Sequence, residues 1–215
     1  SAIPYAVFKM TGIFNSELLE KYQTEKGLSE EEEIDFLKSK DYLIEICQEA
    51  YNQEVRLFID AEESWIQNTI DELCYEMMQR YNQKTAIIFN TFQMYRVDML
   101  ENLHHAIQVA IDQSYFLGVK LVRGAYLEKE RLRAHEDEYS EPLHKEKEAT
   151  DRDFNLGIQA CLDHLEQVHF CVGTHNEQSC QLLCQWMEEK GISQNHPHIY
   201  FAQLLGMSDN ISYNL

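Results

Sequence analysis

Six short apolar runs recur along the chain, and a longer stretch of mixed apolar and polar residues separates each from the next. The runs are Tyr5–Met10, Val55–Ile59, Ala86–Phe89, Val119–Val122, Val168–Val172 and Ile199–Ala202. Each is four to six residues long and nearly continuous in apolar character, which is typical of strands covered on both faces. The pattern therefore predicts six buried β-strands.

Helical patterns occupy the stretches between these runs. They cover Glu30–Tyr51, Ser64–Arg80, Arg96–Phe116, Glu146–Leu165 and Gln178–Glu189. Ser29, followed three residues later by Glu32, indicates a capping box at the start of the first helix. Lys190-Gly191 has the composition of a helix end and predicts where the last helix stops.

The spacing of the predicted strands indicates a parallel sheet. Successive strands are separated by roughly 30 or roughly 50 residues, which leaves room for a helical crossover. Repeated strand–helix units either close into an eight-stranded barrel or remain an open, doubly wound sheet. No GxGxxG sequence follows a predicted strand, which disfavours a dinucleotide-binding open sheet. Because the few prolines and glycines form no linker, we predict a single domain.

Composition and charge exclude several classes of protein. Hydrophobic residues make up 44% of the 215 residues, as expected of a globular protein rather than a disordered one. The formal net charge of −19 argues against a nucleic-acid-binding protein, since phosphate contacts need a basic surface. It also disfavours tight adhesion to an anionic membrane. No run of about eighteen apolar residues is present, so no membrane-spanning segment is predicted.

The six cysteines are scattered through apolar patterns, and Cys180 and Cys184 lie four residues apart on a predicted helix. No matching pair and no histidine at zinc-ligand spacing follows them. We therefore expect reduced core thiols in an intracellular protein and no metal site.

Polar or ionisable residues stand at or just after the end of all six predicted strands. They are Lys9, Asp60-Ala61-Glu62, Asn90-Thr91, Arg123-Gly124, Thr174-His175-Asn176 and Gln203. In a barrel, the C-terminal strand ends and the loops behind them build the active site. The alternative is that these residues only cap helices and turns. Their recurrence at every strand favours an active site.

Seven segments at these positions match motifs of one enzyme family. In chain order they read AVFKMTG, FIDAEESW, IFNTFQMY, VKLVRGAYLEKER, EATDRDFN, VGTHN and FAQLLGM. With these motifs the chain resembles the proline dehydrogenases, both single-function enzymes and the barrel domain of bifunctional bacterial proline-utilisation proteins. The resemblance implies an α/β fold of the (βα)8 TIM-like barrel type that binds FAD at the C-terminal strand ends. It also implies oxidation of L-proline to Δ1-pyrroline-5-carboxylate, the first step of proline catabolism to glutamate.

The resemblance implies catalytic roles for Asp60 and Lys120. Asp60 matches an acidic active-site position, and Lys120 matches a position near flavin N5 that is arginine in many members. Hydride transfer to N5 leaves negative charge on the flavin, which a nearby cation stabilises. Lysine keeps the charge of arginine but loses its fork geometry. The eukaryote-like branch of the family also reads KLVRGAY, so Lys120 is compatible with the family.

Three residues match substrate contacts of the family. Lys9 matches the lysine that pairs with the proline carboxylate, Tyr126 a ring close to the substrate, and Leu205 an apolar wall of the pocket. A lysine on an otherwise apolar strand needs a charge partner, and we expect Asp60 to supply it. Alternatively, Asp60 is a helix N-cap with Glu63 as its capping-box partner.

Other residues match positions that contact FAD. They are Ala61, Asn90, Arg123, Gly124, Ala125, Thr174 and His175. The small Ala61 allows the flavin ring to approach the backbone, and the Asn90 amide addresses polar flavin atoms. Gly124 permits a turn whose amides can face the cofactor. Gln93 is interpreted as a structural neighbour.

Two parts of the family pattern are not found in this sequence. The last helix of the family carries an Arg-Arg pair in a YLxRRxxEN-like motif that clamps the substrate carboxylate, and no Arg-Arg occurs here. The sequence also shows about six of the eight strands that a closed barrel requires. We therefore expect residues 1–215 to form an incomplete proline dehydrogenase barrel domain, truncated at both ends.

Three alternative functions stay open: a hydroxyproline dehydrogenase, a flavin barrel like methylenetetrahydrofolate reductase, and an inactive or assembly-dependent fragment. For partners, the resemblance implies L-proline and, as electron acceptor, a membrane quinone reached by transient membrane contact. The implied location is the bacterial cytoplasm beside the inner membrane, or the mitochondrion in a eukaryote. The oligomeric state is not predicted.

Overall fold

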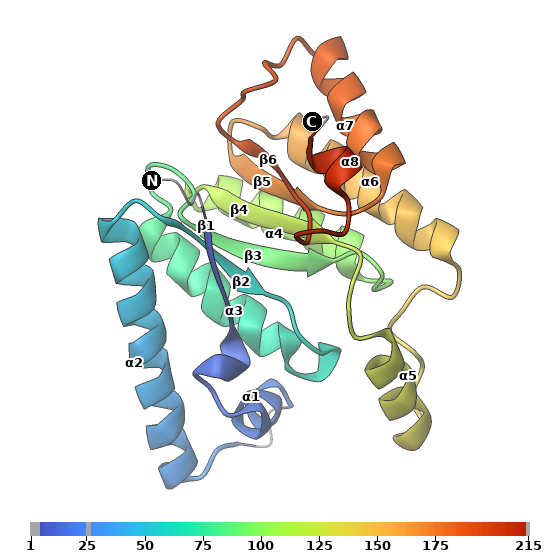
Figure 1. Ribbon diagram of the computed structural model, residues 1–215. Coiled ribbons are helices and arrows are strands. Elements are labelled where there is room, and N and C mark those ends of the chain that lie inside the picture. Colours follow the sequence, from blue (N-terminus) through green and yellow to red (C-terminus); the bar gives the residue numbers. More distant parts are fainter. Residues whose placement is uncertain (1–4, 25–26, 214–215) are drawn as a thin grey trace.

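A six-stranded parallel sheet forms the centre of the protein (Figure 1). The computed structural model describes residues 5–24 and 27–213. The strands are β1 (Tyr5–Lys9), β2 (Arg56–Asp60), β3 (Ile88–Gln93), β4 (Leu117–Val122), β5 (Val168–Gly173) and β6 (Ile199–Ala202). They lie side by side in sequence order, and all five pairings are parallel. The predicted α/β fold with a parallel sheet is therefore confirmed.

Helices connect the strands, and most of the longer ones cover the outer face of the sheet (Figure 1). They are the 3-10 helix η1 (Met10–Gly12) and the α-helices α1 (Ser16–Gln23), α2 (Glu30–Asn52), α3 (Ser64–Tyr81), α4 (Met99–Asp112), α5 (Leu127–Glu136), α6 (Lys147–Asp163), α7 (Glu177–Glu189) and α8 (Asp209–Ser212). Buried residues such as Leu43, Ile70, Leu103 and Phe154 join these helices to the strands in one large apolar core. Burial of this core is the main driving force for the fold.

The sheet curls, so that its first and last strands approach each other on the inner face. Tyr5 of β1 stacks on Phe58, and its ring centroid lies 5.0 Å from that of Tyr200 on β6. The Arg56 guanidinium lies beside both tyrosines, 5.7 Å from the centroid of the Tyr5 ring and 4.9 Å from that of the Tyr200 ring. Since β1 and β6 stand at opposite ends of the strand order, this contact shows that the sheet is wound into part of a barrel.

Helix ends follow the predicted capping chemistry. The Ser29 side chain accepts a hydrogen bond from Glu32 N, and the Glu32 side chain accepts one from Ser29 N, which confirms the capping box. Gly191 follows α7 with φ of +66°, and its N–H donates to Glu188 O while Ile192 N donates to Met187 O. These two bonds form a Schellman motif, so α7 ends where predicted.

The third strand begins later than predicted and includes the polar residues that follow it. Both Ile87 N and Ile88 N donate to Asn82 Oδ1 at 2.9 Å, so this side chain occupies the start of the predicted strand. The sequence NTFQ then continues the strand, buried on both sides. Helices α1 and α5 were not predicted, because both are short and α5 is strongly polar.

All six cysteines are free thiols in the described part of the chain, and five are buried as expected. Cys184 is exposed, since it lies on the outer side of α7, where the prediction of a core position was wrong.

His169 is a buried histidine on the inner face of the curled sheet. It is only 1% exposed, and its ring stacks on that of His198 at 3.5 Å. Neither ring nitrogen has a hydrogen-bond partner among the described residues. Burial, followed by the repulsive charges of His198 and Arg56, lowers the pKa of His169 from 6.5 to about 3.

This lowered pKa predicts a loss of stability in acid. Because the unfolded chain takes up the His169 proton first, the contribution is lost as pH falls from 6.5 towards 3. It amounts to about 1.4 kcal/mol per pH unit within that window. A His169→Phe variant is expected to lose less stability than the parent between about pH 7 and about pH 5, measured by urea unfolding. The exposed His104→Phe variant is the control, and parallel losses in parent and His169→Phe would contradict the prediction.

Candidate active site

A cavity of about 660 Å³ opens at the C-terminal ends of the strands. All six strands or their following loops contribute to its lining: Lys9, Asp60, Ala61, Thr91, Gln93, Lys120, Val122, Arg123, Gly124, Ala125, Tyr126, Gly173, Thr174, His175, Asn176, Ala202, Gln203 and Leu204, together with Lys147 of α6. The cavity lies where a parallel barrel places its active site. Most residues that the sequence singled out are therefore brought together.

An ion pair between Asp60 and Lys120 lies in the wall of this cavity. Lys120 Nζ donates to Asp60 Oδ1 at 2.5 Å, and the ammonium lies 5.2 Å from the centroid of the Phe58 ring. The two residues come from β2 and β4, so the pair spans β3 at the position of Thr91. The Lys120 side chain is 16% exposed, and this partial burial strengthens the attraction relative to a surface pair.

Lys9 has a different partner from the one expected. Its Nζ donates to the Tyr126 hydroxyl at 2.9 Å, and the Lys9 residue is exposed rather than buried. The hydrogen bond to Tyr126 raises the pKa of Lys9, and the charges of Glu62 and Asp60 add to this effect. The prediction that Lys9 pairs with Asp60 was wrong, because Lys120 reaches that carboxylate directly.

The alternative role of Asp60 as a helix cap is also wrong. Asp60 is the last residue of β2, and the N-cap of α3 is Glu63. Glu62 faces another partner, since its carboxylate accepts bonds from Thr11 N at 2.9 Å and Thr11 Oγ1 at 2.5 Å. Asp60 is therefore free to hold Lys120 at the cavity.

Arg123 is held by a set of neighbours at the end of β4. Its Nε donates to Asp151 Oδ1 at 2.7 Å, and its Nη1 donates to Thr174 Oγ1 at 2.6 Å. Its Nη2 donates to Ser179 Oγ at 3.0 Å, and the guanidinium lies 4.2 Å from the centroid of the Phe154 ring. These contacts fix the arginine between β4, β5, α6 and α7.

The turn formed by Gly124 and Ala125 follows Arg123 directly in the sequence. Gly124 has φ of +140°, and a Cβ added there would stand 2.5 Å from the Tyr95 ring. Both the backbone conformation and the close approach require glycine. Ala125 N donates to Gln93 Oε1 at 3.4 Å, while Gln93 Nε2 donates to Glu62 O at 2.7 Å. Gln93 therefore acts as the predicted structural neighbour, and it also lines the cavity.

Two predicted contact residues lie away from the cavity. Asn90 is fully buried, and its Nδ2 donates to Asp71 Oδ1 at 2.7 Å in the layer between β3 and α3. Side chains alternate along a strand, so Thr91 and Gln93 face the cavity and Asn90 faces the helices. Leu205 is fully exposed, and its neighbour Leu204 lines the cavity in its place. The structure therefore gives no support to the predicted contacts of Asn90 and Leu205.

The remaining predicted positions lie at the cavity. Ala61 is 7% exposed there, and Thr174 accepts the Arg123 bond described above. His175 Nδ1 is 2.7 Å from Ser208 Oγ, and Leu204 N donates to His175 Nε2 at 3.4 Å. His175 therefore joins the β5 loop to the loop after β6.

Sequence reasoning placed Thr91 at a strand end without assigning it a contact, and it gave no role to Asp151. The alternation along NTFQ could have indicated Thr91, because it shares a face with Gln93. Lys147 and Asp151 stand four residues apart on α6 and form an ion pair at 2.5 Å, a spacing visible in the sequence. Among the described lining residues, Lys9, Lys120, Arg123 and Lys147 carry positive charge, and Asp60 carries negative charge. The cavity is thus basic in a chain of net charge −19.

The family model described as proline dehydrogenase matches residues 8–215. The chain belongs to the proline dehydrogenase family. The mitochondrial proline dehydrogenase 1 of Homo sapiens is 35% identical over 190 residues, covering 87% of this chain and 32% of the relative. The corresponding protein of Caenorhabditis elegans is 34% identical and covers 88% of this chain and 32% of the relative. The chain thus spans about a third of the length of these curated relatives.

Solved structures confirm the barrel type of the fold. Proline utilization A from Bdellovibrio bacteriovorus, inactivated by N-propargylglycine, matches 95% of this chain with a TM-score of 0.83. The sequence identity is 19%, and the match covers 20% of that chain. Together with the six parallel strands, this match identifies an incomplete TIM-like barrel.

Proposed function

We propose that this chain provides the flavin and substrate site of a proline dehydrogenase, an oxidoreductase that converts L-proline to Δ1-pyrroline-5-carboxylate with FAD. The observation that carries the proposal is the Asp60–Lys120 pair, which shares one cavity with the Lys9–Tyr126 pair. These four residues occupy family motifs on β1, β2 and β4 and in the loop after β4. Membership of the family supports the same activity.

The residues of the cavity fit FAD. Four cationic side chains in the lining suit an anionic cofactor. At Gly124 no side chain covers the backbone of the turn. Arg123, Gly124, Ala125, Thr174 and His175 would hold the cofactor, with Ala61 allowing close approach of its ring. Asn90, whose side chain binds Asp71 behind the sheet, is not among these residues.

When bound, FAD would supply the two-electron acceptor for a hydride from the substrate. Lys9, with its raised pKa, stays charged and binds the substrate carboxylate. Tyr126 then lies beside the substrate ring, because its hydroxyl is tied to Lys9. L-proline with a neutral amine loses a hydride from carbon and a proton from nitrogen, which leaves the imine product. Lys120, oriented by Asp60, stabilises the negative charge that the hydride brings into the cavity.

A spectroscopic experiment tests the proposal. The purified protein is expected to show the yellow absorption of bound flavin, and L-proline added without oxygen is expected to bleach it. D-proline serves as the control, since a site that holds the carboxylate at Lys9 and the ring at Tyr126 is expected to favour one enantiomer. A protein that is loaded with FAD yet keeps its colour with L-proline would refute the proposal.

Hydroxyproline dehydrogenase is a second candidate. A protein of that name from Xenopus laevis is 33% identical over 192 residues and covers 87% of this chain. The ratio of kcat/KM for L-proline and trans-4-hydroxy-L-proline separates the two functions. A ratio above one supports the first candidate, and a ratio below one supports the second.

A quinone is the electron acceptor we propose, reached by transient contact with a membrane. No helix among residues 5–24 and 27–213 is long and apolar enough to cross a bilayer. The relatives of Homo sapiens and Caenorhabditis elegans are named as mitochondrial, which supports a mitochondrial location. Faster reoxidation of the reduced protein by a soluble ubiquinone analogue than by oxygen would support the quinone, and the reverse order would refute it.

A further inference from the structure

Glu130 is a buried acid on a helix that is otherwise largely exposed. Helix α5 stands apart from the sheet in Figure 1, and the buried residues along it are Glu130 and Ala134. Glu130 is 0% exposed. Burying a carboxylate is costly unless hydrogen bonds replace the lost water. The partners of Glu130 therefore explain why it is buried.

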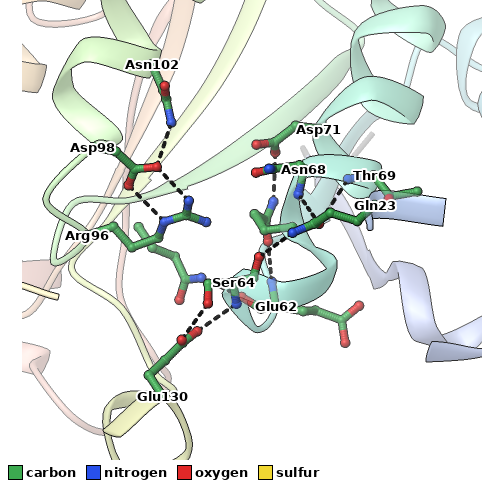
Figure 2. A network of polar contacts seen from close by, with 12 residues as sticks. Gln23, Glu62, Ser64, Asn68, Thr69, Asp71, Arg96, Asp98, Asn102 and Glu130 are labelled. Carbon is green, nitrogen blue, oxygen red and sulfur yellow. Dashed lines mark hydrogen bonds and ion pairs between the residues drawn. The ribbon is translucent and has the colours of Figure 1, made fainter. Parts of the chain in front are cut away.

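Both carboxylate oxygens of Glu130 bind the first residue of α3. Glu130 Oε1 accepts from Ser64 N at 2.7 Å, and Glu130 Oε2 accepts from Ser64 Oγ at 2.6 Å, as Figure 2 shows. The local N-cap, Glu63, makes no side-chain capping bond in the described structure. Glu130 thus caps α3 from a distant part of the sequence, where the helix dipole also favours a negative charge.

This contact joins the two loops that carry the proposed site. Ser64 follows the β2 end with Asp60 and Ala61, and Glu130 lies one turn after Tyr126. Glu130 N donates to Tyr126 O at 2.9 Å, so the buried carboxylate anchors the turn that begins with Tyr126. Tyr126 in turn accepts the bond from Lys9.

Neighbouring ion pairs are less suited to fix the first turn of α5. Lys129 binds Glu63 at 2.5 Å, but its side chain is 65% exposed. Arg133 binds Glu20 and lies 4.4 Å from the Trp65 ring centroid, with its side chain 28% exposed. The exposed Lys129 pair contributes little because water and salt screen it, and Arg133 ties down the last turn of α5, away from Tyr126. Glu130 is the fully buried member of this interface.

We propose that Glu130 is a positioning residue for the substrate side of the cavity. By capping α3, it fixes the first turn of α5 and so sets where Tyr126 stands against Lys9. The proposal rests on the proposed function, since it assigns Tyr126 and Lys9 to the substrate.

The test compares Glu130→Gln with Glu128→Gln, an exposed glutamate on the same helix for which the structure shows no hydrogen bond or ion pair. Hydrogen exchange is measured on the flavin-loaded protein without substrate. In Glu130→Gln, amides within 60–66 and 122–130 are expected to exchange about tenfold faster, while those of α6 keep their rates. KM for L-proline is expected to rise about tenfold with kcat nearly unchanged, because the binding geometry is loosened. The Ser64→Ala variant removes only the hydroxyl and should show the same pattern more weakly. It takes the place of Glu130→Gln in both measurements if Glu130→Gln does not fold.

Two results would overturn the proposal. The first is exchange in Glu130→Gln that matches Glu128→Gln, which would show that the carboxylate does not hold the two loops. The second is faster exchange with an unchanged KM, which would show a purely structural cap. If the parent protein itself does not oxidise L-proline, the proposed function fails, and the exchange comparison alone supports or overturns the link between the loops.

Discussion

A Lys120→Met variant is expected to reduce its flavin with L-proline about 10²–10³-fold more slowly than the parent, as when a donor that stabilises developing charge is removed. Lys120 Nζ is the partner of Asp60 at the cavity wall, and the lysine side chain is mostly buried. Methionine keeps much of the length and apolar volume of lysine but removes the charge. Stopped-flow absorbance of the flavin band, without oxygen and at saturating L-proline, measures the rate.

Three further variants separate the causes of this loss. Lys120→Arg keeps a cation and is expected to retain most of the rate. Asp60→Asn combined with Lys120→Met removes the carboxylate that the single variant leaves unpaired, and a partial recovery would show how much of the loss that carboxylate causes. Lys84→Met changes an exposed lysine far from the cavity and should behave as the parent. Parent-like reduction by Lys120→Met would contradict its proposed role.

A Gly124→Ala variant is expected to lose most of its bound FAD. The added Cβ would lie 2.5 Å from the Tyr95 ring, and φ of +140° is a conformation that alanine rarely adopts. The turn must therefore move, and Arg123 and Ala125 on either side of it move too. We expect the ratio of flavin to protein after purification to fall about tenfold or more, since a misplaced turn removes several cofactor contacts together.

The matched control for this change is Gly12→Ala. An added Cβ at Gly12 meets no atom within 4 Å, so the variant should keep its flavin and its melting temperature. Circular dichroism of Gly124→Ala distinguishes a local change at the turn from unfolding of the barrel. Full flavin content in a folded Gly124→Ala protein would show that the turn does not hold the cofactor.

The sequence predicted the fold well because buried parallel strands leave a clear signal. Each strand is a nearly continuous apolar run, and the spacing between runs required helical crossovers. The short helix α5 escaped prediction because it is polar and is held mainly by contacts distant in the sequence, such as Glu130 with Ser64.

The candidate site was predicted in its composition more than in its pairings. Residues at strand ends are brought together by any parallel barrel, so most of the predicted positions reached the cavity. Which charged side chains bind each other depends on their length and on the strand that separates them. Lys120 crosses β3 to reach Asp60, and Lys9 is left for Tyr126. Asn90 was wrongly predicted to contact the cofactor because the predicted third strand ended before it. The alternation of side chains along the rest of β3 was therefore not recognised.

The contact between Tyr5 and Tyr200 has a consequence for how the protein folds. Neighbouring strands can pair one after another along the chain, since each lies beside the next in sequence. The two tyrosines belong to the first and last strands, so their contact closes nearly the largest loop in the chain. Loop closure of this kind is entropically costly and slow. We therefore expect the curvature that forms the cavity to be completed last, and the ability to bind a ligand to emerge only after most secondary structure is in place.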